Sequence, residues 1–213
     1  MSAALVKELR ERTGLGLLEC KKALADANGD VDAAIEALRK SSGMKAAKKA
    51  GRTAADGVVA IKASEDGAYA TMVEVNSETD FVARDENFLG FVGAVVDKAM
   101  SQRITEVAAL AADDIEDARE AFVQKIGENI SVRRVVAHEV EDGVIGGYVH
   151  GNNRIAVLVS LKGGSEDLAR DVAMHIAALN PQVVSPADMP EEVVAKEREI
   201  YAAQAADSGK PAE

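Results

Sequence analysis

The hydrophobic spacing of this chain changes once, near residue 55, and that change limits the folds open to it. Before that point, apolar side chains recur every three or four residues, which is the spacing of short amphipathic helices. Beyond it, β-rich runs at 58–63 and 69–75 are separated by the turn signal Glu65-Asp66-Gly67. Strands joined by turns this short are antiparallel. The sequence therefore predicts an α+β fold, with a small helical region ahead of antiparallel sheets.

Three short helices are predicted within the first 42 residues, the third beginning after Asp30, a good N-cap. Their expected apolar faces are Leu5, Val6 and Leu9; then Leu17, Cys20, Leu24 and Ala27; then Val31, Ala34, Ile35 and Leu38. Helices of this length form a module that is marginal alone. The arrangement is similar to the three-helix ubiquitin-associated (UBA) type, which grips other proteins.

Further helices and strands are predicted along the rest of the chain. One helix opens at Asp85 or Glu86, another at Asp113 or Asp114, and a third ends at Asn180-Pro181. Their apolar faces are Phe88, Phe91, Val92, Val95 and Ala99; Ile115, Ala118, Phe122 and Ile126; and Leu168, Val172, Ile176 and Leu179. Strands are expected at 131–140, 144–150 and 154–161, and a long helix with sparse apolar points starts at Pro190.

Charge is unevenly distributed along the 213 residues. The net charge is −11, yet residues 1–52 carry +4, which leaves −15 for the remainder. One run of basic residues contains no acidic side chain: Arg39, Lys40, Lys45, Lys48, Lys49 and Arg52. The pattern favours a solvated helix face that leads into a linker. The functional alternative is a patch for an acidic partner or for RNA phosphates, and the acidic remainder favours the protein partner.

Motifs for common enzyme chemistry are missing from the sequence. It has no phosphate-binding loop, no zinc-binding pattern and no Gly-x-Ser-x-Gly elbow. The single cysteine, Cys20, excludes an internal disulfide, favours the reducing cytoplasm, and lies on an apolar helix face where a buried thiol is the expected state. His175 is expected in a core and His150 at an exposed strand end. No apolar run is long enough for a membrane span. The prediction is a protein without catalytic residues, cofactor or metal.

The segment from Asn76 to Asp85 is the exception, because Phe81 occurs in a polar connection between a strand and a helix. By pattern alone, Phe81 is an inward anchor for that connection. An exposed ring on a rigidly flanked loop would instead be a binding hot spot. Thr79 could be an N-cap, with Asp80 favourable to the helix dipole.

Several motifs together resemble bacterial elongation factor Ts, the family of nucleotide-exchange factors of elongation factor Tu. The motifs are LRERTGLG at 9–16, ECKKAL at 19–24, KAAKKAG at 45–51, AADGV at 54–58, EVN at 74–76, TDFV at 79–82, IGENI at 126–130 and MHIA at 174–177. They occur in the family's order, and the resemblance extends from Ala4 to Pro211.

The resemblance implies an organisation of the whole chain. Residues 1–52 would form the UBA-like domain and a basic linker, 53–140 one half of the core, and 141–182 part of a second half. Residues 183–213 would begin a coiled-coil hairpin whose remainder is missing, so a C-terminally truncated form is expected.

The resemblance also implies how the protein works. Asp80 and Phe81, flanked by Thr79 and Val82, would form a wedge that enters the GTPase domain of elongation factor Tu and disturbs its Mg²⁺ site indirectly. The other partner-binding positions implied are Leu9, Arg12, Gly16 and Lys21 in the N-terminal domain, together with Gly127 and His150 in the core, His150 toward the partner's distal domain. The partner is the GTPase, with neither membrane nor direct nucleic-acid binding, and a dimer of the two-protein complexes is among the assemblies implied.

Three other functions fit parts of the sequence. The N-terminal domain could bind ubiquitin-like or nascent-chain targets, in which case residues 1–52 alone would account for all binding. Cys20 could be a nucleophile, and its alkylation would then abolish activity. Residues 39–52 could bind RNA, with a steep salt dependence.

Overall fold

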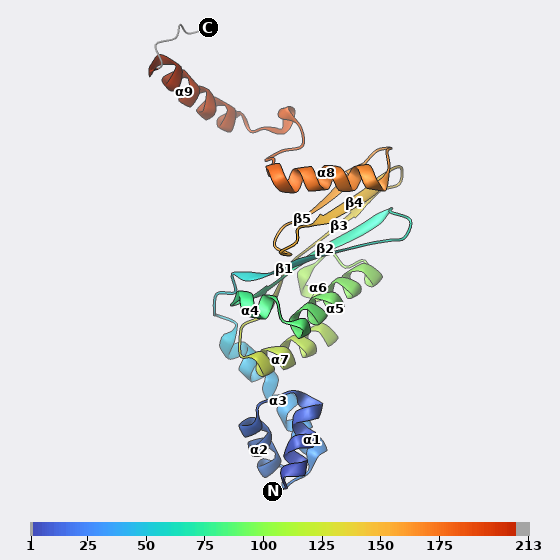
Figure 1. Ribbon diagram of the computed structural model, residues 1–213, viewed down its shortest axis with the longest axis vertical. Coiled ribbons are helices and arrows are strands. Elements are labelled where there is room, and N and C mark those ends of the chain that lie inside the picture. Colours follow the sequence, from blue (N-terminus) through green and yellow to red (C-terminus); the bar gives the residue numbers. More distant parts are fainter. Residues whose placement is uncertain (1, 208–213) are drawn as a thin grey trace. The chain divides into compact units, whose positions relative to one another are not determined.

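The computed structural model describes residues 2–207, and the chain divides into two compact units, residues 1–177 and 178–213. The first unit begins with three helices: α1 (Ala3–Thr13), α2 (Leu17–Asp26) and α3 (Val31–Lys49) (Figure 1). The Asp30 side chain accepts a hydrogen bond from the Ala33 amide, which confirms the predicted cap of α3. The third helix is longer than expected, because it continues through the basic run to Lys49.

The three N-terminal helices share a small core. Its buried members are Val6, Leu9, Leu15, Cys20, Ala23, Leu24, Ala34 and Leu38. The predicted buried thiol of Cys20 is confirmed, whereas Leu17 is exposed and the expectation that it faces this core is wrong. Ala46, two turns beyond Leu38 on α3, belongs instead to the core of the following domain. Helix α3 therefore packs in both cores and joins them.

An antiparallel sheet in the order β1-β2-β3 follows, formed by β1 (Asp56–Ala63), β2 (Tyr69–Ser77) and β3 (Ser131–Glu139). Helices α5 (Glu86–Gln102) and α7 (Asp114–Ile126) lie on one side of it (Figure 1). The core between them contains Val58, Val73 and Val75 from the strands with Phe88, Phe91 and Phe122 from the helices. The predicted strands and both helices are confirmed, although Ala118 is exposed. A short helix not predicted from the sequence, α6 (Val107–Leu110), adds Leu110 to this core.

The opposite face of this sheet carries a second, two-stranded sheet of β4 (Val144–Val149) and β5 (Ala156–Leu161). Helix α8 (Glu166–Leu179) crosses β4 so closely that a Cβ at Gly146 would lie 2.5 Å from the Cβ of Ala169. Only glycine fits at such an approach.

Helix α8 buries small residues rather than the large ones expected. Ala169 and Ala173 are buried, whereas Leu168 and Leu179 are exposed. His175 is also exposed, so its expected place in a core is wrong. The close crossing at Gly146 explains the difference, because only alanine side chains are short enough to fit between helix and strand.

The second unit contains a 3-10 turn, η1 (Pro186–Asp188), and helix α9 (Glu191–Asp207). The long helix expected after Pro190 is confirmed, and none of its described residues is buried. Residues 208–213, the end of the expected hairpin segment, lie outside the described residues, and the domain boundaries at 52, 140 and 182 stay predictions. Within residues 2–207, no helix combines the length and apolarity that a membrane crossing needs.

Candidate functional site

A single helical turn, α4 (Asp80–Ala83), presents Phe81 to solvent directly after the end of β2. Val82 and Ala83 are buried in the core, whereas the Phe81 side chain is 82% exposed. Successive helical residues point about 100° apart, so burying two neighbours on the inner side turns the ring outward. The expectation that Phe81 is an inward anchor is wrong.

Local hydrogen bonds fix the start of this turn. The Thr79 hydroxyl accepts from the Val82 amide at 3.4 Å, which confirms Thr79 as the N-cap. Asp80 lies in the first turn, where a negative charge is favourable, and forms an exposed ion pair with Arg84 at 3.0 Å. The ring is thus held on a capped turn with charged neighbours.

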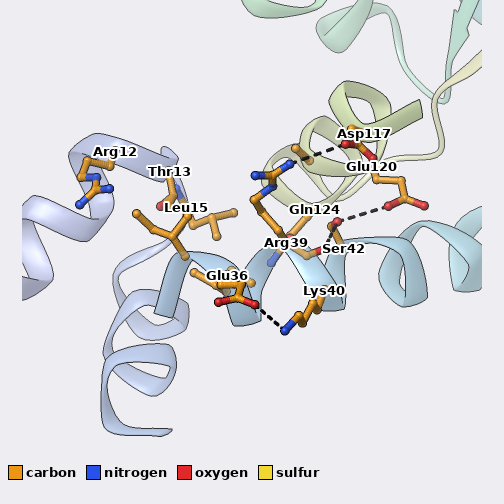
Figure 2. A pocket seen from close by; sticks show the side chains of 13 residues that line it. Arg12, Thr13, Leu15, Glu36, Arg39, Lys40, Ser42, Asp117, Glu120 and Gln124 are labelled. Carbon is orange, nitrogen blue, oxygen red and sulfur yellow. Dashed lines mark hydrogen bonds and ion pairs between the residues drawn. The ribbon is translucent and has the colours of Figure 1, made fainter. Parts of the chain in front are cut away.

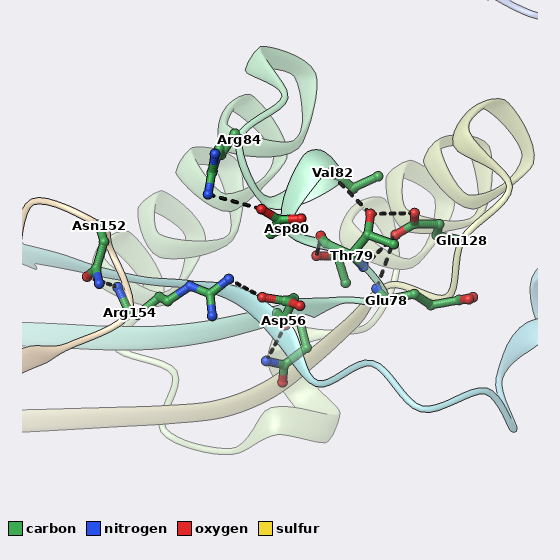
Figure 3. Close-up of polar contacts among 11 residues, drawn as sticks. Asp56, Glu78, Thr79, Asp80, Val82, Arg84, Glu128, Asn152 and Arg154 are labelled. Atoms are coloured by element: carbon green, nitrogen blue, oxygen red, sulfur yellow. Dashed lines mark hydrogen bonds and ion pairs between the residues drawn. The ribbon is translucent and has the colours of Figure 1, made fainter.

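A carboxylate distant in sequence clamps the same turn (Figure 3). Glu128 accepts hydrogen bonds from the backbone amides of Glu78 and Thr79, both at 3.1 Å, and from the Thr79 hydroxyl at 2.7 Å. Gly127, just before it, ends α7 in the left-handed conformation with φ 86°, which glycine adopts at no steric cost. Gly127 therefore lies next to the residue that clamps the turn. The sequence reasoning missed Glu128, although it lies within the IGENI motif.

The turn between β4 and β5 reaches the other side of the Phe81 turn. The carbonyl of Asn153 accepts from the Val59 amide of β1 at 2.7 Å, and Arg154 forms an ion pair with Asp56. A hollow of about 300 Å³ lies between the two turns, lined in part by Asp80, Arg84 and the residues 151–154.

His150 begins this β4–β5 turn and is exposed, as the sequence predicted. Its Nδ1 atom lies 3.0 Å from the Tyr148 hydroxyl. The side chain is therefore available on the surface, on the turn that faces Asp80 across the hollow.

The four N-terminal candidates differ in exposure. Leu9 is fully buried in the helical core, so it cannot touch a partner, and its predicted contact role is corrected to packing. Arg12 is exposed and paired with Asp32 at 2.7 Å. Gly16 is the N-cap of α2, and Lys21 lies exposed on the same helix.

An exposed apolar pair lies between Gly16 and Lys21. Leu18 is 81% exposed and Leu17 is 55% exposed. The sequence reasoning missed Leu18 and placed Leu17 in the core. Helical spacing could have identified Leu18, which lies well away from the core face of Cys20, Ala23 and Leu24. Leu17 shares that face and is exposed at the first residue of the helix.

Most side chains of the basic run contact a neighbouring segment, although the run stays largely exposed. Five of its six cations contact nearby acceptors: Arg39 with Asp117, Lys40 with Glu36, Lys45 with Glu19, Lys49 with the carbonyl of Gly127, and Arg52 with Glu78. Figure 2 shows Arg39 and Ser42 of α3 facing Asp117 and Glu120 of α7. The run is helical up to Lys49 and four of its six side chains are exposed, so the predicted solvated helix face is confirmed, whereas the linker expected over these residues is helix.

Glu19, on α2, links this helix to both α3 and α7. It accepts from Lys45 of α3 and, at 2.7 Å, from Gln124 of α7. Partial burial by itself would raise the pKa of Glu19, but these hydrogen bonds outweigh it and hold the pKa below its usual value.

This lowered pKa predicts a pH-dependent stability difference. A carboxylate whose folded pKa is depressed stabilises the fold above its unfolded pKa and loses that contribution as the pH falls through the folded value. We expect Glu19→Gln to lower the free energy of unfolding by about 1 kcal/mol at pH 7. The gap from the wild-type chain should narrow once the pH falls below the ordinary glutamate pKa of about 4.3, and it should be lost as the pH falls through the lower folded pKa. Urea unfolding at a series of pH values measures it, and a gap that does not change with pH would contradict this assignment.

The described residues contain no group of three or more His, Cys, Asp or Glu side chains placed to hold a metal ion. Cys20 is buried against the Leu15 carbonyl, 3.7 Å from its sulfur, in a setting typical of a structural thiol. The chemistry available at residues 79–82 is therefore that of a contact surface: a rigid aromatic ring flanked by charges.

Comparisons with known proteins agree on one family. A family model described as elongation factor TS matches residues 78–213, a range that includes the Phe81 turn, Gly127 and His150. Elongation factor Ts of Hahella chejuensis is 68% identical over 213 residues, covering 100% of this chain and 74% of the relative. The corresponding protein of Saccharophagus degradans is 67% identical over 213 residues, 100% of this chain and 73% of its own length. That of Arthrospira platensis is 58% identical over 219 residues, 100% of this chain and 88% of its own length.

Proposed function

The chain belongs to the elongation factor Ts family, and on that premise we propose that it is a translation elongation factor that speeds guanine-nucleotide release from elongation factor Tu. The observation that carries the proposal is the exposed Phe81 ring on a turn whose neighbours, Val82 and Ala83, are anchored in the core. An exchange factor needs no catalytic side chain. It needs a rigid group that fits the nucleotide-free partner better than the nucleotide-bound one.

The proposed mechanism uses Asp80 and Phe81 as a wedge. A guanine nucleotide is held in a GTPase by phosphate-loop amides and by Mg²⁺. Insertion of the ring near the helices that flank the partner's Mg²⁺ site would displace that site indirectly. An aromatic ring suits this role, since it has few rotamers to freeze and removes roughly 150–250 Å² from water on burial. Because binding couplings are reciprocal, nucleotide and factor weaken each other's binding by the same factor.

A second contact supplies the grip. One surface at the start of α2, here called the grip surface, consists of Gly16, Leu17, Leu18 and Lys21. Arg12 is exposed nearby in sequence, at the end of α1. We place this surface on the partner's GTPase domain and the exposed His150 on its distal domain. Exposed leucines supply apolar area, while Lys21 can steer association with an acidic surface. The free, buried thiol of Cys20 is consistent with action in the reducing cytoplasm.

Mixing the chain with elongation factor Tu that is loaded with a fluorescent GDP analogue tests the function. We expect the release rate, in excess unlabelled GDP, to rise with the concentration of the chain and to reach a plateau. A release rate equal to the spontaneous one at every concentration would refute the proposed function. Residues 1–52 as a separate fragment should not reproduce the acceleration, since they lack Phe81.

A further inference from the structure

Residues Gly127–Asn129, between the end of α7 and the start of β3, hold the end of helix α3. The carbonyl of Gly127 accepts from the Lys49 ammonium at 2.5 Å. The Asn129 side chain donates to the carbonyl of Arg52 at 2.8 Å and to that of Ala50 at 3.3 Å. Asn129 is only 7% exposed, so these bonds are shielded from water and order the chain just beyond α3.

Two of these residues, Glu128 and Asn129, also hold the segment that leads into the Phe81 turn. Glu128 accepts the three hydrogen bonds from Glu78 and Thr79 described above. In the reverse direction, the Asn129 amide donates to the Glu78 carboxylate at 2.6 Å, and Arg52 approaches that carboxylate at 3.5 Å. The two segments therefore grip each other through a pair of carboxylates, Glu78 and Glu128, each bonded to the other segment's backbone.

We propose that Glu128 and Asn129 are positioning residues that set the Phe81 turn and the end of α3 at a fixed separation. The inference rests on the proposed function. Helix α3 packs in the N-terminal core that carries the grip surface, so fixing its end fixes that surface relative to the wedge. When two contact surfaces are held at the separation that one partner requires, the second contact forms without a further search.

The two residues act on different steps. Glu128 restrains the backbone at residues 78 and 79, and without that restraint the turn must be ordered at the moment the ring inserts. Asn129 restrains the end of α3. Without it, the separation between the grip surface and the wedge no longer matches the separation that the partner requires. Glu128 therefore governs release within the complex, and Asn129 governs formation of the complex.

Glu128→Gln keeps the shape of the side chain but replaces one acceptor oxygen by an NH₂ group that faces donors. We expect it to lower the release rate at saturating factor by roughly three- to tenfold, the effect of one or two lost hydrogen bonds. Asn129→Ala should leave that plateau unchanged and raise the half-saturating concentration by a similar factor. Glu139→Gln is the matched control, because Glu139 pairs with Arg103 at the far end of β3, where both side chains are exposed; it should change neither quantity.

A combination with Phe81→Ala separates positioning from general stability. In that background the ring is gone, so Glu128→Gln should have no further effect on the plateau. An equal additional loss, or a wild-type plateau for Glu128→Gln in the intact chain, would overturn the inference while leaving the function standing. If Glu128→Gln does not fold, Thr79→Val removes one donor to the same carboxylate and Thr79→Ser keeps it. Only the valine should lower the plateau, and equal rates for the two would count against the inference.

Discussion

Phe81→Ala is expected to lower nucleotide release from elongation factor Tu, at saturating factor, by on the order of thirtyfold or more. That is the effect of losing a binding hot spot worth about 2 kcal/mol or more. The fold should be unaffected, because the ring is 82% exposed and surface substitutions usually stay within about 0.5 kcal/mol. Stopped-flow release and a thermal melt of the same preparation measure the two effects.

Tyr201→Ala is the matched control for the loss of an exposed aromatic ring. Tyr201 is 66% exposed on α9, and its removal should leave release within about twofold of the wild-type rate. An unchanged plateau for Phe81→Ala would reject the wedge, whereas a large loss of stability would show that the ring is buried in solution.

Phe88→Ala, seven residues further along the chain, is expected to destabilise the fold, which Phe81→Ala leaves unaffected. Phe88 is fully buried, with its ring centroid 6.2 Å from that of Phe122. Removing such a ring leaves a cavity and should lower the free energy of unfolding by about 3–5 kcal/mol, a large part of the roughly 5–15 kcal/mol typical of a domain.

Urea unfolding followed by circular dichroism measures this loss, with an unchanged m-value as the sign that only stability has altered. Leu89→Ala is the control on the same helix, because Leu89 is partly exposed and its removal should cost no more than about 1 kcal/mol. Equal losses for the two variants would contradict the packing of α5 described above.

Much of the fold could be predicted because its signals are local. The turn at Glu65-Asp66-Gly67 and the β-rich runs around it predict the β1–β2 hairpin, and the spacing of Phe88, Phe91 and Val95 predicts α5. Short elements such as α6 escaped prediction, because four residues show no period.

Two errors concern packing between segments that are far apart in sequence. The continuation of α3 through the basic run was not predicted. The residue that this part of the helix buries is the small Ala46 rather than a large apolar residue. Helix α8 buries alanines because β4 approaches it at Gly146. Neither of these two packing contacts leaves a periodic pattern of large apolar side chains in the sequence.

The family resemblance named the residues of the site and implied an exposed Phe81, whereas the residue pattern alone could not give their directions. Phe81 is outward because Val82 and Ala83 are buried and because Glu128, about fifty residues away, holds Thr79. The pattern around Phe81 alone favoured the wrong direction. Leu9 illustrates the converse, since its motif suggested a contact whereas its burial assigns it to the core.

The central claim is that the Phe81 ring enters the partner, and a fluorescent ring at that position tests it most directly. The chain contains no tryptophan, so Phe81→Trp adds a single reporter, and the same titration with the wild-type chain supplies the background to subtract. On mixing with nucleotide-free elongation factor Tu, the difference emission should shift to shorter wavelength as the indole leaves water, and excess GDP should reverse the shift. A complex that forms while the indole keeps the emission of a solvent-exposed ring would contradict the account.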